Sequence, residues 1–193
     1  MIEPYLFHSV KWHNFDLLIK IIESGYILPR NMLKEGTVTD KNNIFNGTKY
    51  ISLSQKSLVD RGINYYDRFV VDSPCFVLKS DNLDLIYPLY ADKDYMSQDE
   101  WNSIIFQDSD KRYSYYEDEL QTKNPISLQN NLIAVGMPVD YLNNNREGAC
   151  YDKEVKKVKN ALKVMNLNVP IINSSKYDFA DNMENIKRNT LHI

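Results

Sequence analysis

Residues 5–29, YLFHSVKWHNFDLLIKIIESGYILP, contain the signals that decide the fold. The first six residues are mostly apolar or aromatic and predict a short β-strand. From Asn14 to Ser24, apolar residues recur at helical spacing, which predicts an amphipathic helix with Asn14 as its N-cap. Gly25 stands where a C′ glycine ends a helix, and the chain then continues in extended form. The stretch therefore predicts a strand, a helix and a second extended segment.

The rest of the chain alternates short β-prone runs with a few helical ones. Residues 132–136 are apolar throughout, as in a buried strand. Residues 153–165 predict a helix with apolar residues on one face and lysines on the other, and we interpret the lysines as a solvated basic face. Residues 179–187 predict a weaker last helix. Further extended segments are predicted at 50–54, 75–79, 85–89, 119–122, 126–128 and 169–172, and a short helix at 55–60.

Composition indicates one globular domain. The chain has 193 residues, of which 43% are hydrophobic and 25% charged, with no internal repeat and no linker rich in Gly, Ser or Pro. We therefore expect a single domain over 1–193, with a core at about 4–142 and a C-terminal extension at about 143–193.

Charge and cysteine content argue against several kinds of site. The net charge of −3 lacks the overall basic excess of a nucleic-acid-binding protein, although a local basic groove remains compatible with it. The chain has two cysteines, Cys75 and Cys150, no CxxC pair and three histidines, so we expect no metal site. Free thiols are favoured over a single disulfide, because we expect a reducing compartment.

The N-terminal residues, MIEP, lack the basic and apolar regions of a signal peptide, and no run of about 18 apolar residues is present. We therefore expect a cytoplasmic protein with no membrane partner. Delivery into a host cell by a leaderless route would be compatible with the same sequence.

Three segments stand out together in the sequence. The first strand carries His8, the strand after residue 47 carries Tyr50 followed by small hydroxyl residues such as Ser52, and the run Glu117-Asp118-Glu119 enters a third strand. In this order and spacing, the chain resembles the ADP-ribosyltransferase superfamily, in its His–Tyr–Glu branch of poly-ADP-ribose polymerases and diphtheria-like toxins. The resemblance covers roughly residues 4–135 and includes the Lys56-Ser57 pair.

The resemblance implies an α+β fold of the ADP-ribosyltransferase type, with two small packed β-sheets, flanking helices and an NAD cleft. It also implies roles for five positions. His8 would bind the ribose of the adenosine half, and the backbone of Ser9 would hold the nicotinamide carboxamide. Tyr50 would stack on the nicotinamide ring, with Tyr65 or Tyr66 as a second aromatic residue and Ser52 lining the same site.

Glu119 is the expected catalytic carboxylate. Cleavage of the bond between nicotinamide and ribose develops positive charge on the ribose, and a fixed carboxylate stabilises that charge. Glu117 is the alternative, because alternate residues of a strand share a face. We prefer Glu119 because β-prone residues follow it directly. Ser9 departs from the family's usual glycine, and its side chain could crowd the ring.

The expected function is transfer of ADP-ribose from NAD, which serves as substrate, to a macromolecular acceptor, either a protein or a nucleic acid. Such an enzyme suits a microbial or phage toxin or effector, for which an antitoxin or immunity protein would be a partner. An NAD glycohydrolase and a non-catalytic binding module of the same fold are the alternatives, because fold resemblance alone does not establish function.

Overall fold

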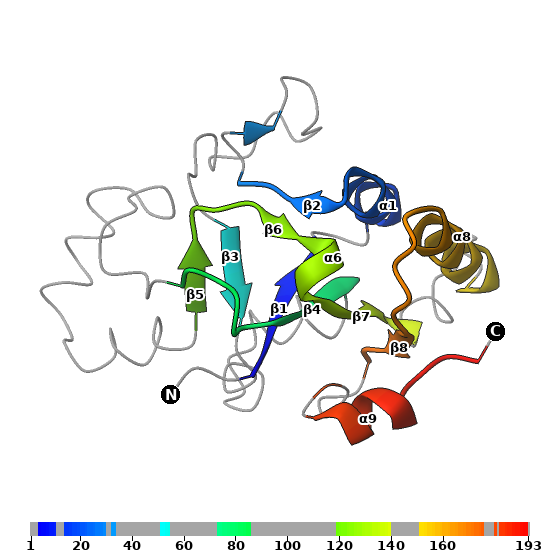
Figure 1. Cartoon of the computed structure of the whole chain (residues 1–193). Helices are drawn as coiled ribbons and strands as arrows, with labels where there is room; N and C mark the ends of the chain where they lie inside the picture. The colour runs from blue at the N-terminus through cyan, green and yellow to red at the C-terminus, as the bar shows by residue number, and fades with distance from the viewer. Residues whose placement is uncertain are drawn as a thin grey trace, which may run out of the picture.

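The structure, a computed structural model, describes residues 4–10, 14–29, 32–33, 51–54, 73–85, 119–139, 151–175, 180 and 182–192. These residues form a six-stranded sheet, a two-stranded sheet and helices (Figure 1), which confirms the mixed α+β class. The predicted helix at 55–60 lies outside the described residues, as does the predicted strand at 85–89 except for Leu85. Among the described helices, none is long and apolar enough to cross a membrane.

The large sheet has the strand order β5-β3-β1-β4-β7-β8. Its neighbouring strands pair antiparallel, except that β7 and β8 run parallel. Sequence neighbours are therefore seldom sheet neighbours, and β1 lies at the centre between two strands from later in the chain. The bounds are β1 Tyr5–Ser9, β3 Ile51–Ser54, β4 Cys75–Lys79, β5 Glu119–Thr122, β7 Leu132–Met137 and β8 Ile171–Asn173.

The first helix, α1 (Phe15–Ser24), begins and ends where the sequence predicts. The Asn14 side chain accepts a hydrogen bond of 2.9 Å from the backbone N–H of Leu17, which satisfies one of the free donors at the helix start. Gly25 ends the helix with φ +74°, a left-handed conformation that glycine adopts without strain.

Replacing Asn14 with alanine should lower the free energy of unfolding by about 1 kcal/mol, because the Leu17 N–H loses its acceptor. Asn14→Asp keeps an acceptor oxygen at this position and should stay close to wild type. Urea unfolding of the three proteins measures the effect. Equal losses in both variants would show that the cap does not stabilise the helix.

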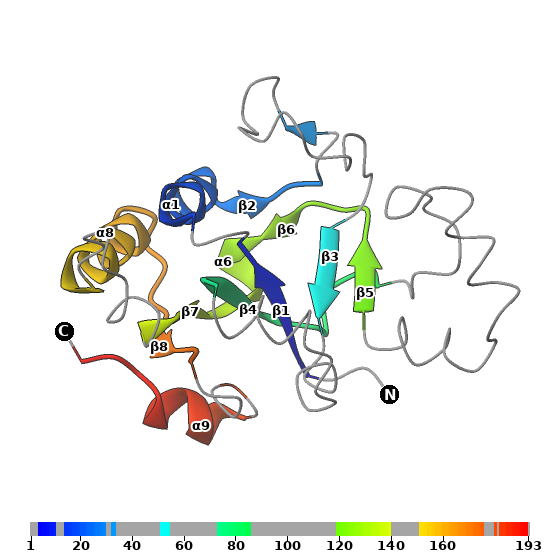
Figure 2. The ribbon, with the colours of Figure 1, turned by 180° about the vertical axis from the view of Figure 1, so that it is seen from behind.

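Alternation along β1 separates two cores on opposite faces of the large sheet. Leu6 and Val10 belong to the larger core, and Phe7 belongs to the smaller one. The larger core is covered by α1 and by α8 (Tyr151–Val164), which pack against each other, and the smaller one includes Ile186 of α9 (Met183–Arg188). Figure 2 shows the same arrangement from behind.

The small sheet pairs two segments that are distant in sequence. β2 (Tyr26–Ile27) pairs antiparallel with β6 (Ile126–Ser127), and both Ile27 and Ile126 are buried in the larger core. The prediction of an extended segment at 126–128 is wrong at its last residue, because Leu128 begins the short helix α6 (Leu128–Asn131). This helix buries Leu128 in the larger core, and its four residues are too few to show a helical period.

The C-terminal region belongs to the same sheet and core. The predicted helix at 153–165 is α8, which buries Val155, Val158 and Leu162 in the larger core. β8 extends the sheet, and the chain beyond α9 then runs along the outer edge of β8. The Asn173 N–H donates to the Asn189 carbonyl, the Leu191 N–H donates to the Ile171 carbonyl, both at 2.8 Å, and Ile172 forms a bridge with Thr190.

The last helix is shorter at its start than the sequence predicts. The prediction began at residue 179, whereas α9 begins at Met183. Asn182 is the reason, because its side chain accepts from the Asn185 N–H at 2.9 Å and so caps the helix at this point.

Candidate functional site

His8 occupies the centre of the large sheet. It lies between Leu6 and Val10 on the face of the larger core, and its side chain is half-buried. In register it faces Phe76 of β4, whose ring lies nearly parallel to the imidazole at 6.5 Å between ring centroids. A packed apolar neighbour on one side restricts how the imidazole can turn.

The His8 ring is bonded to the neighbouring strand through its Nδ1 atom. Nδ1 lies 3.0 Å from the backbone carbonyl oxygen of Ser52, which can only accept, so Nδ1–H is the donor. In the neutral ring, Nε2 is then left as a hydrogen-bond acceptor. Burial lowers the pKa of His8 below 6.5, although the hydrogen bond to Ser52 opposes the shift. A neutral imidazole in this tautomer can accept a hydrogen bond from a hydroxyl group such as a ribose OH.

The lowered pKa of His8 predicts a loss of stability in mild acid. Well above pH 6.5, both the folded and unfolded states are neutral at this residue. As the pH falls through 6.5, the unfolded chain takes up a proton that the folded state resists, so the free energy of unfolding decreases.

Urea unfolding between pH 7.5 and 5.5, taken as roughly the range around the ordinary histidine pKa, measures this decrease. His8→Asn keeps an N–H donor for the Ser52 carbonyl and does not titrate, so its stability should fall less over this range. The other two histidines of the chain are present in both proteins and cancel in the comparison. Parallel curves for the two proteins would contradict the prediction.

Ser9 and Ser52 point away from His8. Ser9 follows His8 on β1 and pairs with Cys75, while Ser52 lies between Ile51 and Leu53, both of which are buried in the larger core. Strand alternation therefore places both serine side chains on the other face of the sheet. Both are half-buried, and it is the backbone of Ser52, not its hydroxyl, that contacts His8.

Glu119 is the first residue of β5. Its backbone pairs with Ser54 of β3, and Ser54 in turn pairs with Phe7 of β1, so its position in the register is on the face of Phe7 and not on that of His8. β5, which begins at Glu119, is thus the neighbour of β3, the strand after Tyr50. β3 is in turn the neighbour of β1, which contains His8. Tyr50, Tyr65, Tyr66 and Glu117 lie outside the described residues, as does the Lys56-Ser57 pair.

Gln121 of β5 is a polar residue that is not among the site residues predicted from the sequence. It is 4% exposed and pairs in register with Ser52, so the two side chains share a face of the sheet. A buried amide needs hydrogen-bond partners and can orient a neighbouring group. The alternation Glu119-Leu120-Gln121 is the only signal in the sequence that could have indicated its position.

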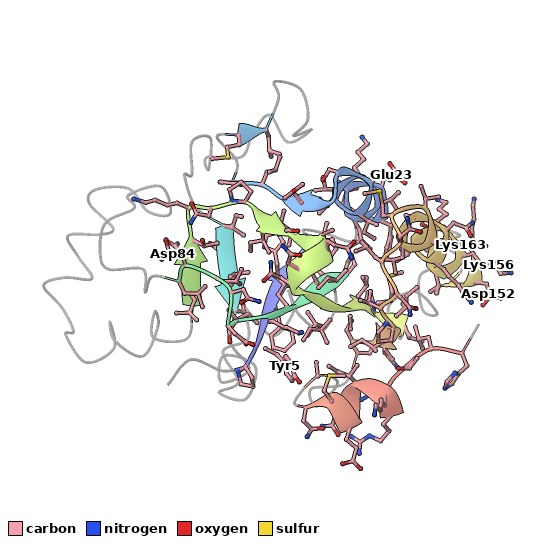
Figure 3. The ribbon with its side chains drawn as sticks, viewed as in Figure 1. Tyr5, Glu23, Asp84, Asp152, Lys156 and Lys163 are labelled. Carbon is pink, nitrogen blue, oxygen red and sulfur yellow. The ribbon has the colours of Figure 1, made fainter. Side chains whose placement is uncertain are left out.

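Two pockets lie elsewhere on the described parts of the chain. One, of about 700 Å³, follows the end of β5 and is lined by amide side chains and Asp84 (labelled in Figure 3). The other, of about 500 Å³, lies beside α8 and β8. His8, Ser9 and Ser52 line neither pocket. Among the described residues, no group of three or more His, Cys, Asp or Glu side chains could hold a metal ion.

The candidate site is therefore the three-strand group β5-β3-β1, in which a neutral His8 on β1 is fixed to the backbone of Ser52 on β3, while the side chains of Ser9, Ser52 and Gln121 lie on the opposite face of the sheet. Comparison of the chain with protein-family models, curated proteins and solved structures found no match.

Proposed function

We propose that this chain is an ADP-ribosyltransferase that cleaves NAD and transfers ADP-ribose to a macromolecular acceptor. The observation that supports it most is the adjacency of β5, β3 and β1. These three strands are consecutive neighbours in one sheet, although some 40 to 110 residues of chain separate them. In sequence, each of the three segments resembles an NAD-binding segment of the same family. The proposal includes a fold of the ADP-ribosyltransferase type with an NAD cleft.

The geometry of His8 supports a role in binding a ribose. With Nδ1–H bonded to the Ser52 carbonyl, the Nε2 lone pair accepts a hydrogen bond from a hydroxyl of the adenosine ribose in the proposal. The ring is neutral near pH 7 because burial lowers its pKa, so the Nε2 lone pair is available as an acceptor. In the proposal, the backbone of Ser9 binds the nicotinamide carboxamide. Tyr50 and Tyr65 make the aromatic contacts with the nicotinamide ring.

The proposed reaction breaks one bond and forms one. The bond between C1′ of the ribose and the nicotinamide nitrogen breaks, and nicotinamide leaves with the electron pair. The carboxylate of Glu119 stabilises the positive charge that develops on the ribose. The acceptor gives up a proton, for which Glu119 is the proposed base, and attacks C1′. With water as the acceptor, the same steps give an NAD glycohydrolase.

Incubation of the purified protein with NAD labelled in its adenylate phosphate, together with cell lysate, tests the proposal. Label that becomes attached to macromolecules and is released by nuclease indicates a nucleic-acid acceptor, while label released by protease indicates a protein. Free nicotinamide without attached label indicates a glycohydrolase. If neither product forms and calorimetry detects no NAD binding, the chain is a binding module and the enzymatic proposal is wrong.

A further inference from the structure

The lysines of α8 are concentrated on its solvent-facing side. Lys156, Lys159 and Lys163 follow one another at spacings of three and four residues, so they lie in a row along one side of the helix. All three are exposed, whereas the opposite side is buried in the larger core. Figure 3 shows Lys156 and Lys163 on the outer side of α8. We call these three residues the lysine row.

Few acidic side chains of the helix offset this positive charge. Glu154 is almost buried and pairs with Lys157, at 3.0 Å between carboxylate oxygen and Nζ, so it does not belong to the row. Asp152 lies at the N-terminal end of the same side, one turn before Lys156. The helix has no acidic residue between Lys156 and Lys163, so its own side chains do not neutralise the C-terminal two turns of the row.

The C-terminal region that contains α8 is more basic than the rest of the chain. Residues 151–193 contain eight of the 23 Lys and Arg residues and five of the 26 Asp and Glu residues, a net charge of +3. Residues 1–150 contain the other 15 basic and 21 acidic residues, a net charge of −6. A chain that is acidic overall thus carries a basic C-terminal region, and its net charge of −3 conceals this local surface.

A pocket opens at the C-terminal end of the lysine row. Its volume is about 500 Å³, and Lys159 and Lys163 of the row line it together with the amides of Asn166 and Asn168. The rest of the lining is largely aliphatic. An aliphatic cavity with cationic and amide groups suits a ligand that has a flat, weakly polar part attached to an anion. The aliphatic lining residues are Val155, Leu162, Leu167, Val169, Ile171 and Leu191.

We propose that the lysine row and this pocket bind a single-stranded nucleic acid. The row extends over eight residues, from Lys156 to Lys163, or roughly 10 Å along the helix, a length that fits two to three phosphates of one strand. An unstacked base of a single strand can enter the pocket, whereas the bases of a duplex are paired and stacked. The surface thus provides both a phosphate contact and a place for a base.

This surface is separate from the candidate site. α8 packs on α1 near the β7–β8 end of the sheet, and β5 lies at the opposite end, as both Figure 1 and Figure 2 show. The proposed role is therefore to anchor a strand and not to take part in chemistry. A binding assay without NAD tests it, so its outcome does not depend on the proposed transferase activity.

The assay measures the fluorescence anisotropy of a labelled oligothymidylate with the full chain at low salt. Lys156→Gln/Lys159→Gln/Lys163→Gln should weaken binding by at least about tenfold and lower the slope of log affinity against log salt by about 2, because three phosphate contacts are lost. Glutamine forms helix about as well as lysine, so the fold should persist, and urea unfolding checks this. The matched control is Lys79→Gln/Lys123→Gln/Lys187→Gln, which removes the same charge from exposed positions outside α8 and should bind like wild type.

The result expected with other probes is equally specific. A duplex of the same length should bind more weakly than the single strand, and an abasic oligomer should bind more weakly than oligothymidylate. Absence of oligonucleotide binding by the wild type, or equal losses in the two triple variants, would overturn the proposal. Binding of polyglutamate that depends on the lysine row, without binding of oligonucleotides, would overturn it in favour of an acidic protein partner.

Discussion

Glu119→Gln should lower the rate of ADP-ribose transfer by at least about 100-fold, a loss comparable to that of one preorganised electrostatic group in other enzymes. The substitution preserves the shape of the side chain and removes its negative charge. The charge is expected to matter most in the transition state, when the ribose becomes cationic, so the loss should appear mainly in kcat. Release of nicotinamide from NAD at saturating substrate measures it.

The matched control is Glu117→Gln, which removes the same charge two residues earlier and should retain activity close to wild type. Both proteins should unfold at the wild-type urea concentration, so that any loss of rate is not a loss of fold. If Glu117→Gln inactivates the protein and Glu119→Gln does not, the catalytic carboxylate is Glu117. If neither variant changes the rate, the proposed reaction does not depend on this acidic segment.

Gly136→Ala should lower the free energy of unfolding by about 3 kcal/mol, at the upper end of the usual cost of overpacking. Gly136 lies in β7 between Cys75 of β4 and Ser174, which follows β8. A Cβ atom at this position would lie 2.5 Å from the Cys75 Sγ and 2.9 Å from the Ser174 Cβ. Both neighbours are fully buried in strongly packed surroundings, so neither has space into which to move.

A double-mutant cycle separates this overlap from other effects of the substitution. Cys75→Ala removes the Sγ atom that the new methyl group would meet, so Gly136→Ala should cost less in the Cys75→Ala background than in wild type. Thermal and urea unfolding of the four proteins give the coupling. Equal costs in both backgrounds would show that the sheet relaxes around the methyl group. Burial raises the pKa of the Cys75 thiol to about 12, so in the folded wild type this cysteine should also be inert to thiol reagents.

Local elements of the fold could be predicted from the sequence where one or two residues determine them. Asn14 and Gly25 define the two ends of α1, and the apolar run at 132–136 gives the buried strand β7. α6 could not be predicted, because a four-residue helix shows no period and its formation depends on the burial of Leu128. The predicted start of α9 is too early because the apolar pattern does not indicate the N-cap at Asn182.

The arrangement of strands could not be derived from local pattern. The order β5-β3-β1 depends on pairings between segments far apart in the chain, and no periodicity encodes such pairings. For the same reason, the hydrogen bond between His8 and the Ser52 backbone, and the burial of Gln121 opposite Ser52, could not be predicted from the sequence. The proposed roles of Glu119, Tyr50 and Tyr65 remain predictions.

The segment that runs beside β8 covers one border of the large sheet. A strand at the border of a sheet exposes unpaired backbone groups that recruit further strands, and proteins avoid aggregation by covering them. Here the Asn189 carbonyl accepts a hydrogen bond from the Asn173 N–H, and the Leu191 N–H donates one to the Ile171 carbonyl. A chain cut before residue 189 would lose this cover and offer β8 to neighbouring molecules. We therefore expect a chain without residues 189–191 to self-associate more readily than the full chain.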